Sequence, residues 1–243
     1  MTDYASSLAR FTNETRDHKM TVLQDQGMYR HLAFTDPKGS FYRFDLVTWP
    51  NNLFVRADGM SFGFAISPTV DLFRLFRESN HGDINPGYWQ EKVTAGRGDL
   101  KSWSEEKFRA WLIEEASEAE ARYPGAVEAV GQQILWSEDH SLEYRGTAEF
   151  AVASFIHGDF RLRIPDTWEQ SFDDWSWEYL FACRAIVWGI RQYDATICGS
   201  HCPEHLDHYC RRSPSHQPGI CRDVKQKGDE SCTWDPAKKA VLR

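Results

Sequence analysis

The chain has 243 residues, of which 41% are hydrophobic, 14% aromatic and 26% charged, a composition typical of globular rather than disordered proteins. Its formal net charge of −8 argues against a protein that wraps nucleic acid, because broad phosphate contacts need an excess of Lys and Arg. The N-terminal residues contain no apolar run, and no segment approaches the roughly 18 consecutive apolar residues of a membrane span. We therefore expect a cytoplasmic protein with no membrane partner and with reduced cysteines.

Residues 20–66 predict an antiparallel sheet, because short segments rich in aromatic and β-branched residues alternate with turn residues. The turn residues include Asp36-Pro37-Lys38-Gly39 and Asp58-Gly59, where Pro presets its backbone angle and Gly permits a positive one. The four or five expected strands lie at 20–23, 28–34, 41–49, 53–56 and 61–66.

After Ile66 the spacing of apolar residues becomes helical. Ser67 and Pro68 suit the cap and the first position of a short helix, and a loop is expected over 79–87. Ser104 precedes two acidic residues and predicts the cap of a second helix that ends near Tyr123.

The second half of the chain predicts a third helix over 126–136, and residues 150–156 favour helix over strand. A short strand is expected at 160–164. Asp173 or Asp174 can cap a final helix that continues to Tyr193. Apolar groups occur on nearly all sides of this last segment, so we expect it to be a central, buried helix.

Together these elements predict an α+β fold, with an N-terminal antiparallel sheet packed by three to five helices and followed by a loop-rich Cys/His tail. We expect three regions along the chain. They are a flexible N-terminal segment over 1–19, a globular domain over 20–196 and the tail over 197–243.

The tail holds five of the six cysteines of the chain, with four histidines interleaved. Thiolates and imidazoles bind Zn²⁺, and a closed structural zinc site would stabilise a tail that has few apolar residues. The candidate metal ligands are Cys198, Cys202 and Cys210, with a fourth from His205, His208, Cys221 or Cys232. Their spacing differs from the C-x2-C pairs of short zinc knuckles. Disulfides that link copies into a homo-oligomer, and a tail with no metal role, therefore remain open alternatives.

No familiar catalytic motif occurs, whether the nucleophile elbow G-x-S-x-G, the phosphate loop G-x-x-x-x-G-K or the zinc motif H-E-x-x-H. Side chains capable of acid–base or metal chemistry are scattered along the chain, at His31, Asp45, Asp58, His140 and His157. They support a metal-dependent hydrolase of nucleotides or nucleic acid as one alternative function. Glutamates crowd residues 105–128, which form either a solvated face or an acidic surface offered to a basic groove of another protein.

The segment from Tyr42 to Leu53 has the pattern Y-x-F-D-L-V-T-W-P-x-x-L, and it is followed by the acidic turn Asp58-Gly59 and a short aromatic helix at 71–77. With the late helix at 183–194, these features resemble a widespread bacteriophage accessory family over roughly residues 20–195. The tail is not part of the resemblance. The resemblance implies a phage protein that binds host factors, including defence nucleases, and it is compatible with inhibitors of the Gabija defence system.

The leading hypothesis is therefore a phage-encoded binding protein without enzymatic activity in the host cytoplasm. It would inhibit a host protein, a defence component, by surface occlusion. The phage-like strand motif, the missing catalytic motifs and the acidic surface favour it. A zinc- or disulfide-assisted structural or oligomerisation protein is a further alternative.

Overall fold

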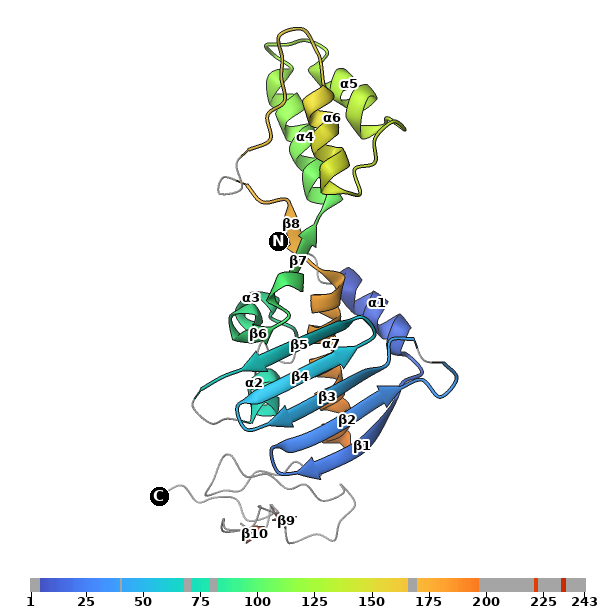
Figure 1. Ribbon diagram of the computed structural model, residues 1–243, viewed down its shortest axis with the longest axis vertical. Helices are drawn as coiled ribbons and strands as arrows, with labels where there is room; N and C mark the ends of the chain where they lie inside the picture. Colours follow the sequence, from blue (N-terminus) through green and yellow to red (C-terminus); the bar gives the residue numbers. More distant parts are fainter. Residues whose placement is uncertain are drawn as a thin grey trace. The chain divides into compact units, whose positions relative to one another are not determined.

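The computed structural model describes residues 5–39, 41–67, 71–78, 83–165 and 170–196, together with the two short strands 221–222 and 233–234. The chain forms two compact units (Figure 1). The residues up to Leu100, together with those from Trp177 onward, are called the sheet unit. Residues 101–176 are called the inserted unit, because they interrupt the sheet unit in the sequence.

In the described part of the sheet unit, six strands form one antiparallel sheet in which each strand pairs with its neighbour in sequence (Figure 1). Gly27 and Gly59 take positive φ angles in the turns after β1 and β4, where any other residue would be strained. The predicted α+β class with an N-terminal antiparallel sheet is thus confirmed. The strands are β1 (Lys19–Gln26), β2 (Tyr29–Thr35), β3 (Phe44–Trp49), β4 (Asn52–Ala57), β5 (Met60–Ala65) and β6 (Val93–Ala95).

One face of this sheet is buried, because apolar side chains alternate along the strands and meet in rows across them. One such row joins Leu32 of β2, Leu46 of β3 and Val55 of β4, which are all fully buried. Helices of the described part of this unit lie on this face or at its margin, as Figure 1 shows. They are α1 (Ala5–Thr15), α2 (Leu72–Glu78), α3 (Pro86–Trp89) and α7 (Trp177–Ala195).

Helix α7 is the central buried helix that its sequence predicts, and it contacts α1, α2, α3 and four strands of the sheet. At Gly189 the helix comes so near the sheet that an added Cβ would stand 2.6 Å from Leu46 Cδ1. Among the described residues, no helix combines the length and the apolar character that a membrane crossing requires.

Helix α1 differs from the expectation of a flexible segment over residues 1–19, of which residues 1–4 lie outside the described part of the chain. Its Phe11 is almost fully buried, with its ring centroid 5.2 Å from that of Phe181 in α7 and 6.4 Å from that of Phe44 in β3. The helix is therefore held by long-range packing, which the local sequence does not reveal.

A buried ion pair joins the sheet to α2. The Arg30 side chain of β2 has no solvent exposure, and its two terminal nitrogens donate to the Asp71 carboxylate over 2.9 and 2.6 Å. The guanidinium also lies over the Phe73 ring, 4.6 Å from its centroid. Asp71 accepts the backbone N–H of Phe73 as well, so the same carboxylate orients the start of α2.

The inserted unit begins and ends in one short antiparallel pair of strands, in which Lys101 lies opposite Trp175. It has its own core, where the rings of Phe108, Trp111 and Phe172 lie 5.3–5.4 Å apart. Its elements are β7 (Lys101–Trp103), α4 (Glu105–Ala119), α5 (Ala126–Val130), a π-helical segment (Gly131–Leu135), α6 (Arg145–Ser154) and β8 (Asp173–Trp175).

Three expectations for this region are confirmed. Ser104 caps α4 by accepting the N–H of Lys107 over 3.2 Å. The helix expected over 126–136 is formed by α5 with the π-helical segment, and residues 150–154 belong to α6.

Other expectations were wrong. The predicted single domain over 20–196 is divided, since residues 101–176 form a unit of their own. Residues 160–164 form no strand, and only Phe160 makes a bridge, to His157. Asp173 and Asp174 do not cap the final helix, because they pair with β7 and the helix begins at Trp177.

Residues 79–82 of the loop predicted over 79–87 lie outside the described residues. The rest of this prediction was partly wrong, since α3 begins inside it at Pro86, with the Asn85 side chain accepting the N–H of Tyr88. Helix α2 begins at Leu72, later than the start proposed at Ser67 and Pro68; Pro68 lies outside the described residues.

We expect residues 101–176, expressed alone, to fold and to unfold cooperatively on heating. Their ends meet at β7 and β8, and their aromatic core is internal to the unit. Near-ultraviolet circular dichroism during thermal unfolding checks this. The fragment with Phe108→Ala should melt at a lower temperature, because Phe108 is fully buried. A fragment without a cooperative transition would contradict the expectation.

Candidate docking surface

The negative charge of the chain is concentrated in the inserted unit. Residues 101–176 contain 16 of the 36 Asp and Glu residues but only 7 of the 28 Lys and Arg residues, a formal net charge of −9. The rest of the chain has 21 basic and 20 acidic residues and is close to neutral. An approaching molecule therefore meets a negative field at this unit, which attracts basic partners.

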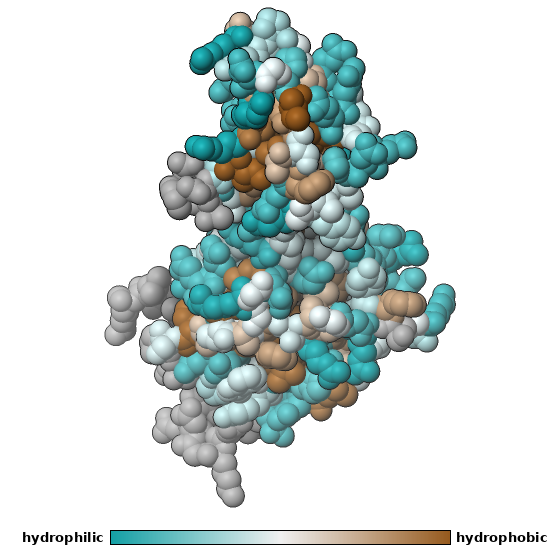
Figure 2. All heavy atoms as spheres, turned by 45° about the horizontal axis from the view of Figure 1, so that its top comes forward, coloured by the Kyte–Doolittle hydropathy of each residue, from teal (hydrophilic) through white to brown (hydrophobic). Residues whose placement is uncertain are grey.

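Large apolar side chains are exposed on the same unit. A single exposed apolar residue is ordinary, but aromatic residues held out to water in a group mark binding surfaces. On the inserted unit, Figure 2 shows apolar side chains reaching the surface among hydrophilic ones. Those after α5 have exposed fractions of 70% for Trp136, 63% for Tyr144, 61% for Phe150 and 66% for Ile156.

Two contacts define a seam between the π-helical segment, the loop after it and α6. The Gln133 side chain exchanges two hydrogen bonds with the backbone of Ile156, over 2.9 and 3.2 Å. At the other end of the seam the His140 ring contacts the Phe150 ring, with centroids 5.6 Å apart. Trp136 lies between Gln133 and His140 in the sequence. We call Trp136, Phe150 and Ile156, together with the exposed acidic residues Glu138, Asp139, Glu143 and Glu149, the acidic aromatic face.

Trp136 is fixed although it is exposed. Its ring lies directly over Gly131 in the π-helical segment, where an added Cβ would stand 2.6 Å from two ring atoms. The backbone N–H of Trp136 donates to the carbonyl of Gly131 over 2.8 Å. An aromatic side chain that is already ordered loses little conformational entropy when a partner covers it.

Acidic residues surround the face in sequence and are exposed: Glu138, Asp139, Glu143 and Glu149. Within the described part of the chain, none of these four forms an ion pair. The nearby Arg145 is directed elsewhere, to Asp173 over 2.6 Å. The carboxylates therefore remain available to cationic groups of another molecule.

One acidic residue of the inserted unit, Glu120, has a structural role instead. The Glu120 carboxylate accepts the N–H groups of Gly125 and Val127, each over 2.8 Å, and so caps α5. These backbone hydrogen bonds, chiefly that from Val127, hold the pKa of Glu120 below its usual value. Glu120 has a structural role in the turn before α5.

Of the five residues proposed for hydrolase chemistry, three belong to the sheet unit and two to the inserted unit. His31 and Asp45 do come together on the sheet face opposite the helices, with Nε2 and Oδ1 3.1 Å apart. Asp58 lies in the turn between β4 and β5. His140 and His157 belong to the inserted unit, where His140 contacts Phe150 and His157 bonds the carbonyl of Pro124.

The seven proposed zinc ligands lie outside the described residues, apart from the backbone of Cys221 in β9 (Cys221–Arg222), which pairs with β10 (Thr233–Trp234). The zinc site therefore stays a prediction. Among the residues that are described, no three His, Cys, Asp or Glu side chains are gathered as metal ligands. Cys183 in α7 is fully buried, and this burial raises the pKa of its thiol, which disfavours the reactive thiolate.

Sequence reasoning found the acidic character of this unit but missed its exposed aromatic residues. Trp136 ends a segment with helical apolar spacing, and such a position is usually buried. One signal could have identified Trp136 as exposed: this aromatic residue is followed directly by the polar residues Ser137-Glu138-Asp139-His140.

Comparison with protein-family models gives no match for this chain. The searches of curated proteins and of solved structures likewise give no match. The resemblance to phage accessory proteins is thus an interpretation of the sequence, and functional inference has to start from the surfaces described above.

Proposed function

We propose that this chain is a phage-encoded binding protein without enzymatic activity that inhibits a host protein by surface occlusion. The partner that the phage resemblance favours is an anti-phage defence component, such as a Gabija-type complex, in the host cytoplasm. The acidic aromatic face carries the proposal, because it combines a fixed exposed Trp with a surplus of carboxylates.

The chemistry of the face defines the partner surface that fits it. A few residues carry most of the binding energy at protein interfaces, and Trp and Tyr that fill well-packed pockets of the partner are enriched among them. The surrounding carboxylates accelerate encounter with a basic surface and disfavour acidic ones. We therefore expect the partner to present an apolar pocket for Trp136 surrounded by Lys and Arg.

Replacing Trp136 by Ala should weaken the complex by about 30-fold or more, the loss typical of an aromatic anchor. The immobilised protein is incubated with lysate of a host that carries a Gabija-type system. A stoichiometric partner is then purified and its affinity measured for each variant. Affinity of the unmutated chain should also fall as salt is raised, because the acidic field is screened.

Phe41→Ala is the matched control, since Phe41 is an exposed aromatic residue of the sheet unit outside the strand motif. It should bind as the unmutated chain does. If Trp136→Ala binds equally well, the acidic aromatic face is not the docking surface. If the chain binds the partner without reducing the partner's activity, occlusion is not its mechanism.

One observation favours a second function. The His31–Asp45 pair has the hydrogen-bonded geometry of a histidine base oriented by a carboxylate. Asp45 is nearly buried beside Ala33, and the Arg43 guanidinium lies 3.9 Å from its carboxylate. Turnover of nucleotides or nucleic acid with divalent metals, lost in His31→Ala, would establish a hydrolase and displace the binding proposal.

A further inference from the structure

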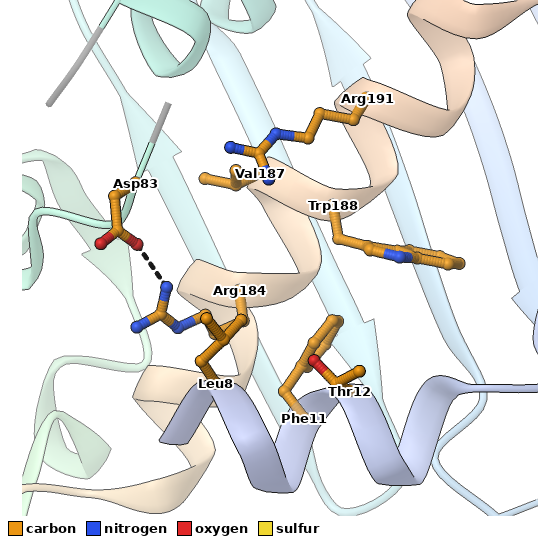
Figure 3. Close-up of a pocket in the computed structure, with 8 residues that line it drawn as sticks. All are labelled: Leu8, Phe11, Thr12, Asp83, Arg184, Val187, Trp188 and Arg191. Atoms are coloured by element: carbon orange, nitrogen blue, oxygen red, sulfur yellow. Dashed lines mark hydrogen bonds and ion pairs between the residues drawn. The ribbon is translucent and has the colours of Figure 1, made fainter. Parts of the chain in front are cut away.

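The strand motif at residues 42–53 directs some of its side chains to the sheet face opposite the helices. In the described part of the sheet unit, the helices lie on the buried face of the sheet or at its margin (Figure 1). That helical side contains a pocket between α1 and α7, where Arg184 pairs with Asp83 (Figure 3). We call the other side the outer face. It consists of the side chains of β1 to β5, and of the residue directly before β3, that point away from the buried row Leu32, Leu46 and Val55.

Three aromatic side chains lie on the outer face, one on each of the neighbouring strands β2, β3 and β4. Tyr29 and Trp49 are each 41% exposed, and the register of β2 and β3 continues to these two residues, so they are neighbours. Phe54 lies opposite Val47, the outward residue before Trp49 in β3. A Cβ added to Gly63 of β5 would stand 3.4 Å from Cδ2 of Phe54, so the Phe54 ring leans over that glycine. Neighbouring strands are about 4.8 Å apart, so the three rings form one aromatic platform.

The charged side chains of the outer face are mainly cationic. Lys19 of β1 and Arg56 of β4 are exposed, and so is Arg43 directly before β3. All three lie toward the end of the sheet away from the exposed aromatic residues. Among the outward residues of β1 to β5, all of which the structure describes, Asp45 is the one carboxylate. Its side chain is 9% exposed and lies 3.1 Å from His31 and 3.9 Å from Arg43, so its negative charge is largely shielded.

We propose that the outer face binds a short single strand of nucleic acid without sequence preference. Every base has a flat face that can stack on an aromatic side chain, and nearby cations can meet the phosphates. Antiparallel sheets with aromatic residues on their surface bind two or three bases in this way. On the outer face the cations exceed the carboxylates even when Asp58, in the turn after β4, is counted.

The positions of the rings and cations suit such a strand. Outward residues two apart in a strand are about 6.8 Å apart, so Arg56 lies beside Phe54 and can reach the phosphate of a base stacked on that ring. A short strand needs few cations. The net charge of −8 argues against wrapping a long nucleic acid and is compatible with this smaller contact.

Fluorescence anisotropy of a labelled oligothymidylate of about 12 nucleotides, within the site sizes of single-strand binders, measures binding to the full chain. EDTA in the buffer removes divalent metals, so binding is measured apart from any metal-dependent hydrolysis. An abasic strand of the same length keeps the phosphates and has no bases. We expect it to bind about tenfold more weakly or worse, because it cannot stack.

Trp49→Ala should weaken oligothymidylate binding by about tenfold, the loss typical of one base–aromatic stack. Arg56→Gln should make the slope of log affinity against log salt less steep by about 0.7, the effect of one lost phosphate contact. The matched controls are Trp136→Ala and Arg122→Gln, at exposed residues of the inserted unit, and both should bind like the unmutated chain. Trp136→Ala also separates this inference from the docking proposal, because it removes the docking anchor and keeps the outer face.

Three results would each overturn the inference: no binding of oligothymidylate by the folded chain, equal binding of the abasic strand, or equal affinities of Trp49→Ala and Trp136→Ala. A second copy of the chain on the outer face would give a different pattern. Sedimentation velocity would then show a dimer that Trp49→Ala dissociates, and oligothymidylate would not bind.

Discussion

Replacing Asp71 by Asn should lower the free energy of unfolding by about 3–5 kcal/mol, the cost of leaving a buried charge without its counter-ion. Arg30 has no solvent exposure and cannot regain water when the Asp71 carboxylate becomes neutral. The amide oxygen of Asn can still accept the N–H of Phe73, so the substitution removes the charge and keeps the start of α2. Urea unfolding at neutral pH measures the difference.

The matched control is Asp194→Asn. Asp194 pairs with Arg77 in the same unit, but both side chains are partly exposed, so this pair should contribute only about 0–1 kcal/mol. Equal losses for the two variants would show that burial of Arg30 does not decide the effect.

The ion pair between Arg30 and Asp71 also makes the stability of the fold depend on pH. Burial alone would raise the pKa of Asp71, but the charge and hydrogen bonds of Arg30, aided by Arg77, outweigh burial and hold this pKa below its usual value. Ionised Asp71 therefore stabilises the fold fully above its unfolded pKa of roughly 3.9, and this contribution disappears as pH falls through the lower folded value. The stability difference between the unmutated chain and Asp71→Asn should shrink over that acidic range. A difference that stays constant would contradict this linkage.

The second large effect is expected at Phe44, in the middle of the strand motif. Phe44→Ala should cost about 3–5 kcal/mol of unfolding free energy, because it removes a fully buried ring and leaves a cavity. The ring stacks on Phe34 with centroids 4.5 Å apart and meets Phe181 and Trp188 of α7 edge to face. One substitution thus weakens the packing of the sheet against its central helix.

Phe41 provides the control for this experiment, since it is three residues earlier in the sequence and 82% exposed. Phe41→Ala should change the unfolding free energy by no more than about 0.5 kcal/mol. Denaturant unfolding of both variants checks the contrast. A small loss for Phe44→Ala would mean that the neighbouring rings close the cavity.

The strand motif that carries the phage resemblance combines two kinds of residue. Phe44, Leu46 and Thr48 point into the core, whereas Asp45 and Trp49 lie on the opposite face, where Asp45 bonds His31. The inward residues of the pattern are accounted for by packing alone. A functional meaning of the motif therefore has to rest on its outward residues.

The elements that local patterns specify were predicted well. The alternation of apolar residues and the turn chemistry around Gly59 determine the strands β2 to β5. Ser104 determines the start of α4, because its hydroxyl accepts an N–H that the helix leaves unpaired. The apolar residues around α7 determine that it is buried.

The elements that the sequence did not predict correctly are those that contacts between distant residues stabilise. β7 and β8 have three residues each and pair across 70 residues of sequence, and α1 depends on Phe11 packing against α7 and β3. Trp136 differs from these elements, because the residue under its ring, Gly131, lies only five residues earlier in the sequence.

The amino-acid sequence by itself determined the α+β class, the meander of strands and the acidic character of residues 101–176, since each depends on composition or on neighbours a few residues apart. Only the tertiary structure decided that these residues form a separate unit with Trp136 exposed. It also decided that Arg30 and Asp71 share a buried pair. The physical reason is that burial and charge pairing depend on which distant segments come into contact. These contacts cannot be inferred from the spacing of residues along the chain.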